Sequence, residues 1–232
     1  MGALSGLDSA ASAVSAQAPT IQPRALQERA QRLPADVWAV GLLVALTLLI
    51  GWHLSHFDAW VEQLDISNQF INWYAYLGKR LAAGELPKWN PYLSSGTPFI
   101  GDPQSGWMYL PAMLLFPFIA PVLAFKLLIG LEFLISGLSM YAFARVMRLG
   151  PLAGLATALV FELHPFANSP TYCCTNRIQV WTWVPMLLLG AVLALRAPTW
   201  GRRVMPWCLS AFALTQIYSG WFGQGTGYAA LV

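Results

Sequence analysis

Charged residues are scarce in this sequence. Of its 232 residues only 10% are Asp, Glu, Lys or Arg, whereas 57% are hydrophobic. A soluble domain carries roughly a quarter charged residues. The composition therefore predicts an integral membrane protein of the all-α class, with the lipid bilayer as its first partner. The net charge of +3 is too small to indicate a nucleic-acid partner.

Several chemical signatures are also missing. Three cysteines are too few for a disulfide framework, and two of them, Cys173 and Cys174, are adjacent. The sequence contains no Gly-rich phosphate loop, no zinc-ligand spacing and no nucleophile elbow. We therefore predict no set of metal-ligating residues and expect no nucleotide cofactor.

Long apolar runs are abundant instead. About twenty apolar residues cross roughly 30 Å of hydrocarbon, and the pattern predicts about five spans in a polytopic bundle. Residues 1–35, rich in Ala, Ser and Gln, are expected to form a disordered tail. The apolar run 107–120 contains Pro111 and Pro117 and is expected to be interfacial or re-entrant. The predicted spans are Trp38–Phe57, Val122–Phe143, Leu152–Phe166, Ile178–Leu195 and one that begins near Trp207.

The basic residues predict an orientation. Arginines cluster before the first span and after the predicted spans at 143 and 195, and cytoplasmic loops are usually the more basic ones. The N-terminus is therefore expected in the cytoplasm, with residues 58–120 forming a large outer loop. Residues 36–232 form the membrane region, and the apolar ending GYAALV suggests that a longer chain continues beyond it.

The most polar stretch of the chain, Asp65–Pro103, lies in this loop. In its first half Asp65, Asn72 and Tyr76 recur at helical spacing and share one face, with aromatic and aliphatic residues opposite. This pattern predicts an amphipathic helix in the membrane surface that ends near Gly84. The second half is rich in Gly and Pro and is expected to be an ordered loop without regular structure.

Several short motifs follow one another in this loop. They are GELP from Gly84, WNPY from Trp89, GTP from Gly96, DPQ from Asp102 and YLP from Tyr109, and QIYSG follows from Gln216. Together they resemble the YfhO-like family of bacterial membrane proteins, within the GT-C superfamily of glycosyltransferases. The resemblance covers about Asp65 to Gln224.

The resemblance implies a fold and a chemistry. The expected fold is a GT-C-like bundle with short helices in the first outer loop of a protein of the bacterial inner membrane. The implied reaction moves a sugar from a polyprenyl-phosphate donor to an extracytoplasmic acceptor. The usual catalytic base is an early acidic residue of that loop, which matches Asp65, with Asp58 as its rival. Asp65 could instead serve only as a helix N-cap.

Further loop residues are candidates for substrate binding. Trp89 could stack on a sugar or belong to an interfacial aromatic belt. Asp102 could bind acceptor or a divalent metal, or simply favour its Gly-Asp-Pro turn. Arg80 and Arg177 could neutralise the donor phosphate or lipid headgroups. Asn90 and Gln104 belong to the motifs that carry the resemblance.

A second function stays open. Glu132, Glu162 and Lys126 fall inside predicted spans, where charged groups are costly and usually face the bundle interior. Six residues separate Lys126 from Glu132, so any partner of Glu132 is expected on another helix. These residues favour the alternative of a non-enzymatic membrane protein, either part of a transporter or an inactive scaffold.

Overall fold

The computed structural model describes residues 23–56, 65–164, 175–221 and 227. The chain divides into two units, residues 1–38 and 39–232, and the packing below is that of the second unit. The predictions that concern Asp58, Cys173 and Cys174 lie outside the described residues.

The described residues are mainly helical, which confirms the all-α class. A single small hairpin pairs β1 (Trp89–Asn90) with β2 (Thr97–Pro98) within the part described. The helices are α2 (Pro23–His56), the π-helix η1 (Ile66–Phe70), α3 (Ile71–Ala82), α4 (Leu110–Leu115), α5 (Pro121–Val146), α6 (Pro151–Glu162), α8 (Asn176–Arg196) and α9 (Trp200–Gly220).

Among the residues that the structure describes, three helices are long and apolar enough to cross a membrane: Pro34–His53 within α2, α5 and α8. The sequence predicts about five spans. The 12 residues of α6 cover only about 18 Å at 1.5 Å per residue, and α9 carries Arg202 and Arg203 near its start. Membrane spans at α6 and α9 therefore stay predictions.

One boundary differs from the sequence prediction. Helix α2 begins at Pro23, inside the segment 1–35 expected to be disordered. The residues from Arg24 to Leu33 are mostly Ala, Leu, Gln, Glu and Arg, which are strong helix formers. The low complexity of the segment concealed this propensity.

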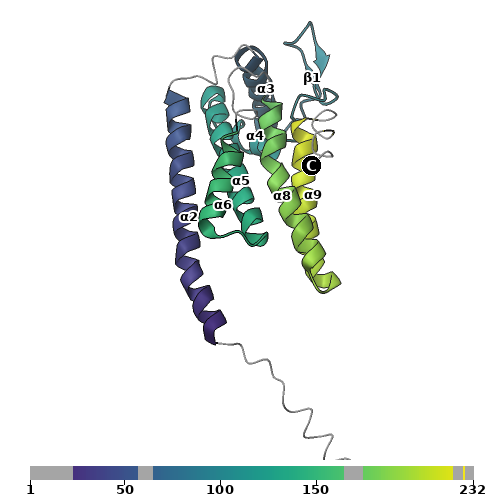
Figure 1. Cartoon of the computed structure of the whole chain (residues 1–232). Helices are drawn as coiled ribbons and strands as arrows, with labels where there is room; N and C mark the ends of the chain where they lie inside the picture. The colour runs from purple at the N-terminus through teal and green to yellow at the C-terminus, as the bar shows by residue number, and fades with distance from the viewer. Residues whose placement is uncertain (1–22, 57–64, 165–174, 222–226, 228–232) are drawn as a thin grey trace, which may run out of the picture. The chain divides into compact units, whose positions relative to one another are not determined.

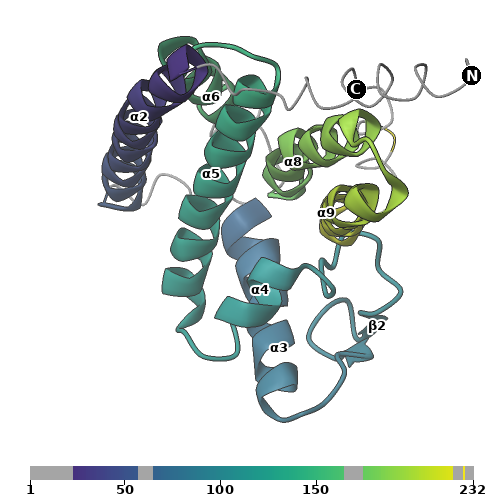
Figure 2. The same ribbon diagram turned by 90° about the horizontal axis from the view of Figure 1, so that it is seen from below.

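The bundle is built around α5 and α8. Helix α8 packs against both α5 and α9, and α6 packs against α5 (Figures 1 and 2). Small residues allow close approach at these contacts, as is common between membrane helices. Gly190 of α8 lies against the backbone of Pro206 and Ser210 in α9, and Gly154 of α6 lies against Tyr141 of α5.

The turns after α5 and α8 lie together at one end of the bundle. The guanidinium of Arg196 donates to the backbone oxygen of Val146 at 2.5 Å. Arg145, Arg148, Arg202 and Arg203 lie in or beside the same two turns. Figure 1 shows these turns at the end opposite α3 and β1. The basic residues thus gather far from the polar loop.

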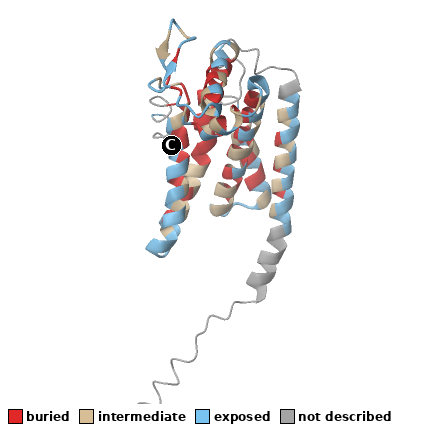
Figure 3. Ribbon diagram, turned by 180° about the vertical axis from the view of Figure 1, so that it is seen from behind, coloured by how far each residue is buried: buried red, intermediate tan, exposed pale blue. Residues whose placement is uncertain are grey.

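Helix α3 packs against both α4 and α5. Its apolar residues Tyr74 and Leu77 have no exposed surface, and Gly78 abuts the backbone of Phe116. Protein therefore covers much of the face that the amphipathic pattern assigned to the membrane surface, and Figure 3 shows this end of the bundle rich in buried residues.

The C-terminus of α3 follows the sequence prediction. Gly84 has a φ of +71°, and Glu85 donates its backbone N–H to the oxygen of Arg80 at 2.9 Å while Gly84 donates to that of Leu81 at 2.9 Å. This is a Schellman motif, in which glycine supplies the left-handed residue. The reversal sends the chain back across α3.

Tyr76 is a correction to the predicted polar face. Its side chain is 8% exposed, because the returning loop lies over it. Its ring contacts the rings of Tyr92 and Phe99 edge-on, at centroid distances of 6.3 and 5.2 Å. The loop also contains the antiparallel hairpin, with Trp89 opposite Pro98 and Asn90 opposite Thr97. The prediction of no regular structure was therefore wrong at these four residues.

The close contact at Gly190 gives a test of the α8–α9 packing. A Cβ there would lie 2.7 Å from the backbone oxygen of Pro206 and 2.8 Å from the nitrogen of Ser210. We expect Gly190→Ala to destabilise the protein by about 1–3 kcal/mol, since overpacking forces the helices apart. Thermal unfolding in detergent measures the change.

Gly130→Ala is the matched control. Gly130 also lies within a helix, but a Cβ there meets nothing within 4 Å. Alanine is the better helix former, so this variant should unfold at an equal or higher temperature. Equal destabilisation by both substitutions would contradict the proposed contact.

Candidate functional site

Three polar contacts, two of them buried, hold residues 65–120 against α8 and α9. Gln179 of α8 donates to the hydroxyl of Tyr74 at 2.5 Å, and the indole N–H of Trp183 donates to the hydroxyl of Tyr109 at 3.0 Å. The backbone N–H of Leu110 donates to the side-chain oxygen of Gln216 at 3.0 Å. The last contact joins the YLP motif to the QIYSG motif, 106 residues later.

The two acidic residues of the bundle are both buried. Glu132 and Glu162 are 0% and 2% exposed, which confirms that both face the interior. The Glu162 carboxylate accepts a hydrogen bond from Thr47 of α2 at 2.6 Å. The Glu132 carboxyl lies within hydrogen-bonding reach of the Tyr109 hydroxyl and close to that of Tyr74.

Burial governs the ionisation of those two tyrosines. Burial raises the pKa of the Tyr109 hydroxyl well above its ordinary value, and the nearby Glu132 carboxyl raises it further. Burial likewise raises the pKa of Tyr74, although its hydrogen bond with Gln179 acts in the opposite direction. Both phenols therefore stay neutral donors and acceptors over the physiological range.

Asp102 belongs to a tight turn. Its side-chain oxygen accepts the backbone N–H of Gln104 at 2.8 Å, and its backbone oxygen accepts the hydroxyl of Ser105 at 2.9 Å. This is an Asx turn, the common structural use of Asp before Pro. The turn also borders a mainly apolar cavity of about 620 Å³, which Leu214 and Tyr218 of α9 complete.

A second, more polar groove lies along η1 and α3. It has a volume of about 370 Å³, and its walls combine side-chain amides, one ammonium group and aromatic rings. Asn68, Asn72 and Lys79 come from the helical segment, whereas Asn90 and Tyr92 come from the WNPY motif. Of these, only Asn90 was a predicted site residue.

The signal for the other groove residues was present in the sequence. Asn68 and Asn72 are four residues apart and Lys79 follows seven later, so all three share a helix face. Sequence reasoning missed the groove because its second wall comes from the hairpin, and nothing local indicates where the hairpin lies.

Asp65 immediately precedes η1 and lies one turn before Asn68. Its side chain is exposed and makes no capping hydrogen bond, so the structure does not support the N-cap role. A π-helical turn such as η1 is rare and frequently occurs at functional sites. Asp65 does not itself line the groove, but it lies one turn before Asn68, which does.

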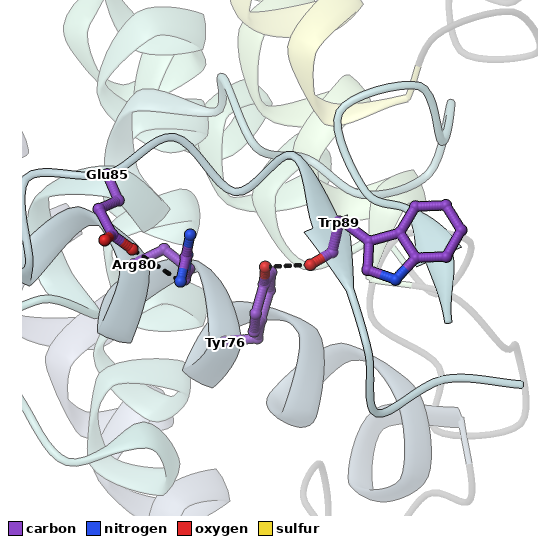
Figure 4. Close-up of polar contacts among 4 residues, drawn as sticks. All are labelled: Tyr76, Arg80, Glu85 and Trp89. Carbon is purple, nitrogen blue, oxygen red and sulfur yellow. Dashed lines mark hydrogen bonds and ion pairs between the residues drawn. The ribbon is translucent and has the colours of Figure 1, made fainter. Parts of the chain in front are cut away.

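Arg80, Trp89 and Arg177 lie apart from the groove walls. Figure 4 shows Arg80 paired with Glu85, at 2.6 Å, and the hydroxyl of Tyr76 donating to the backbone oxygen of Trp89 at 2.5 Å. The Trp89 ring is 55% exposed and points away from Tyr76 in this view. Arg177 lies in the first turn of α8.

These observations define a membrane protein of the all-α class. Residues 65–120, here called the loop domain, carry the polar groove and are held against the helical bundle. Comparison with models of protein families, with curated proteins and with solved structures found no match. Among the described residues, no group of three or more His, Cys, Asp or Glu is placed to hold a metal ion.

The buried tyrosines predict a pH dependence of stability. Unfolded tyrosine ionises near pH 10, whereas Tyr74 and Tyr109 resist ionisation in the folded protein because their pKa values are raised. The stabilisation is complete below pH 10 and is lost as pH rises above it, by about 1.4 kcal/mol per pH unit for each tyrosine.

Unfolding of the Tyr74→Phe and Tyr109→Phe variants between pH 9 and 11.5 tests this. Each substitution should reduce the alkaline slope, whatever it does to stability at neutral pH. Phe125→Leu, which also removes a buried ring, should lower stability without changing the slope. An unchanged slope in both tyrosine variants would show that other groups cause the alkaline loss.

Proposed function

We propose that the chain is a GT-C-like glycosyltransferase of the bacterial inner membrane. It transfers a sugar from a polyprenyl-phosphate donor to an acceptor on the outer side, with Asp65 as the base. The observation that carries this proposal is that Asp65 is exposed and makes no capping hydrogen bond, one turn before Asn68, which lines a groove together with the WNPY motif.

The chemistry suits that position. A base must take the proton of the acceptor hydroxyl while the phosphate leaves, and a carboxylate near the membrane surface can meet a donor whose lipid chain stays in the bilayer. Tyr92, which lines the groove, is 76% exposed, so its ring is accessible for stacking on a sugar. Asp58 remains the rival base, and Arg177 a candidate for the donor phosphate.

The arrangement of the bundle supports the orientation. If α2 leaves the cytoplasm, the α5–α6 and α8–α9 turns return to the cytoplasmic side, where their arginines satisfy the positive-inside rule. This topology needs α6 and α9 to cross, which gives five spans. The groove, Asp65 and the Asp102 turn then face the outside.

One observation favours the alternative of a transporter part. Glu132 is fully buried within α5, one of the helices long and apolar enough to cross a membrane, and ionisable residues inside spans often mark ion or proton relays. Under this alternative, replacing Glu132 would abolish function, whereas replacing Asp65 would matter little.

The Asp65→Asn variant tests the catalytic proposal. The amide keeps the size of the side chain but cannot accept the proton, so transfer from a polyprenyl-phosphate sugar should fall by roughly 10²–10⁴-fold. Radiolabelled sugar incorporated by membranes that contain the chain is the readout. Membrane insertion and unfolding temperature should not change.

Two further variants sharpen that test. Asp102→Asn keeps an oxygen that can accept the Gln104 N–H, so transfer should persist if Asp102 is only a turn residue. Asp58→Asn should also leave transfer intact if Asp65 is the base. Normal transfer by Asp65→Asn combined with loss in Asp58→Asn would assign the base to the rival residue.

Cysteine labelling tests the five-span topology. In a background with Cys173, Cys174 and Cys208 replaced by Ser, we expect Ser94→Cys to react with a membrane-impermeant maleimide in intact cells. Arg148→Cys should react only after the membrane is opened. The reverse pattern, or reaction of both in intact cells, would refute the topology.

A further inference from the structure

Two amide side chains that line the polar groove each keep one hydrogen-bonding group for a ligand. Asn72 donates its side-chain N–H groups to the backbone oxygens of Ser67 and Asn68, at 3.2 and 2.9 Å. Its amide oxygen is thus left to accept. Asn90 uses its amide oxygen to accept the backbone N–H of Tyr92 at 3.0 Å, which leaves its NH₂ group to donate.

A fixed acceptor beside a fixed donor suits hydroxyl groups, because each hydroxyl both donates and accepts. The rings of Tyr76 on α3 and Tyr92 in the WNPY motif both line the groove and meet edge-on. A pyranose ring presents hydroxyls at its edge and C–H groups on its faces. The walls of the groove therefore match a sugar better than an apolar ligand.

The far end of the groove is positive. Lys79 lines it, while its neighbour Arg80 is engaged with Glu85. None of the described residues that line the groove is acidic. A negative charge on the ligand would therefore be attracted to this end and would meet no opposing carboxylate there.

The separation of Asp65 and Lys79 along the helix indicates whether the groove binds the sugar donor or the acceptor. Lys79 follows Asp65 by 14 positions, about 21 Å at 1.5 Å per residue. The donor carries its phosphate on the very carbon that reacts, so the phosphate must lie within a few ångströms of the base. Lys79 is too far from Asp65 to hold it, and a single sugar ring is too short to reach from one to the other.

We propose that the groove binds the acceptor as a saccharide chain that carries negative charge. The chain lies along η1 and α3 with its reacting hydroxyl at Asp65, its rings against Asn72, Asn90 and Tyr92, and an anionic group at Lys79. The direction of the chain rests on the proposed function, whereas the binding of the saccharide does not.

Calorimetric titration of the full chain in zwitterionic nanodiscs tests the proposal. The probes are tri-galacturonic acid and its fully methylated ester, in which a methyl group on each carboxyl removes its negative charge. We expect the acid to bind more tightly, and Lys79→Gln to weaken its binding by roughly three- to fivefold while leaving the ester unchanged. Higher salt should narrow the difference between the probes.

Two matched variants locate the binding. Lys88→Gln removes a loop lysine that does not line the groove, and it should change nothing. Tyr92→Leu removes a ring from the wall, so it should weaken both probes alike. Binding of both probes that survives Tyr92→Leu and Lys79→Gln unchanged would overturn the assignment to this groove.

Three other outcomes would also overturn the proposal. The first is that neither probe binds. The second is that inorganic phosphate binds as tightly as the trimer, which would indicate a simple anion site. The third is that Lys79→Gln has an effect only in the presence of anionic lipid, which would indicate a site for lipid headgroups. If the unmodified protein binds the probes as expected but the Asp65→Asn variant still transfers sugar, only the catalytic proposal fails. If the Asp65→Asn variant loses transfer but the unmodified protein binds neither probe, only this inference fails.

Discussion

The loop domain depends on the matching of buried polar groups where it meets the bundle. Tyr74, Tyr109 and the Leu110 backbone each find a partner on α8 or α9. Leaving one such group buried without a partner costs about 1–3 kcal/mol, so the loop can seat in few other registers. A purely apolar contact between the same elements would allow it to slide.

The groove is a consequence of this docking. Once Tyr74 and Leu77 are buried, the opposite face of the helix, with Asn68, Asn72 and Lys79, must point away from the bundle. The Schellman motif at Gly84 then returns the chain across Tyr76, whose hydroxyl fixes the backbone at Trp89. The position of Asn90 relative to Asn72 thus follows from two local devices and one tertiary contact.

The sequence predicted well what depends on local pattern. The apolar runs gave α5 and α8 within a few residues, and Gly84 gave the end of α3, because span length and capping are properties of neighbours in sequence. It could not predict that Thr47 meets Glu162, or that Tyr76 lies under the loop. Both contacts depend on segments that come together only after the bundle has formed. The helical periodicity placed Tyr76 on the polar face of the helix, but the returning loop buries it.

The position of Glu132 bears on the choice between the two functions. A relay needs a polar path that leads to the carboxylate, yet neither the groove nor the cavity beside Asp102 is lined by Glu132 or Glu162. Glu132 lies instead beneath the loop domain, close to two tyrosines that hold this domain in place. A buried carboxyl beside two tyrosine hydroxyls fits a polar cluster that holds residues 65–120 against the bundle. Glu132 is thus better explained by the support of the segment that carries the groove than by a relay.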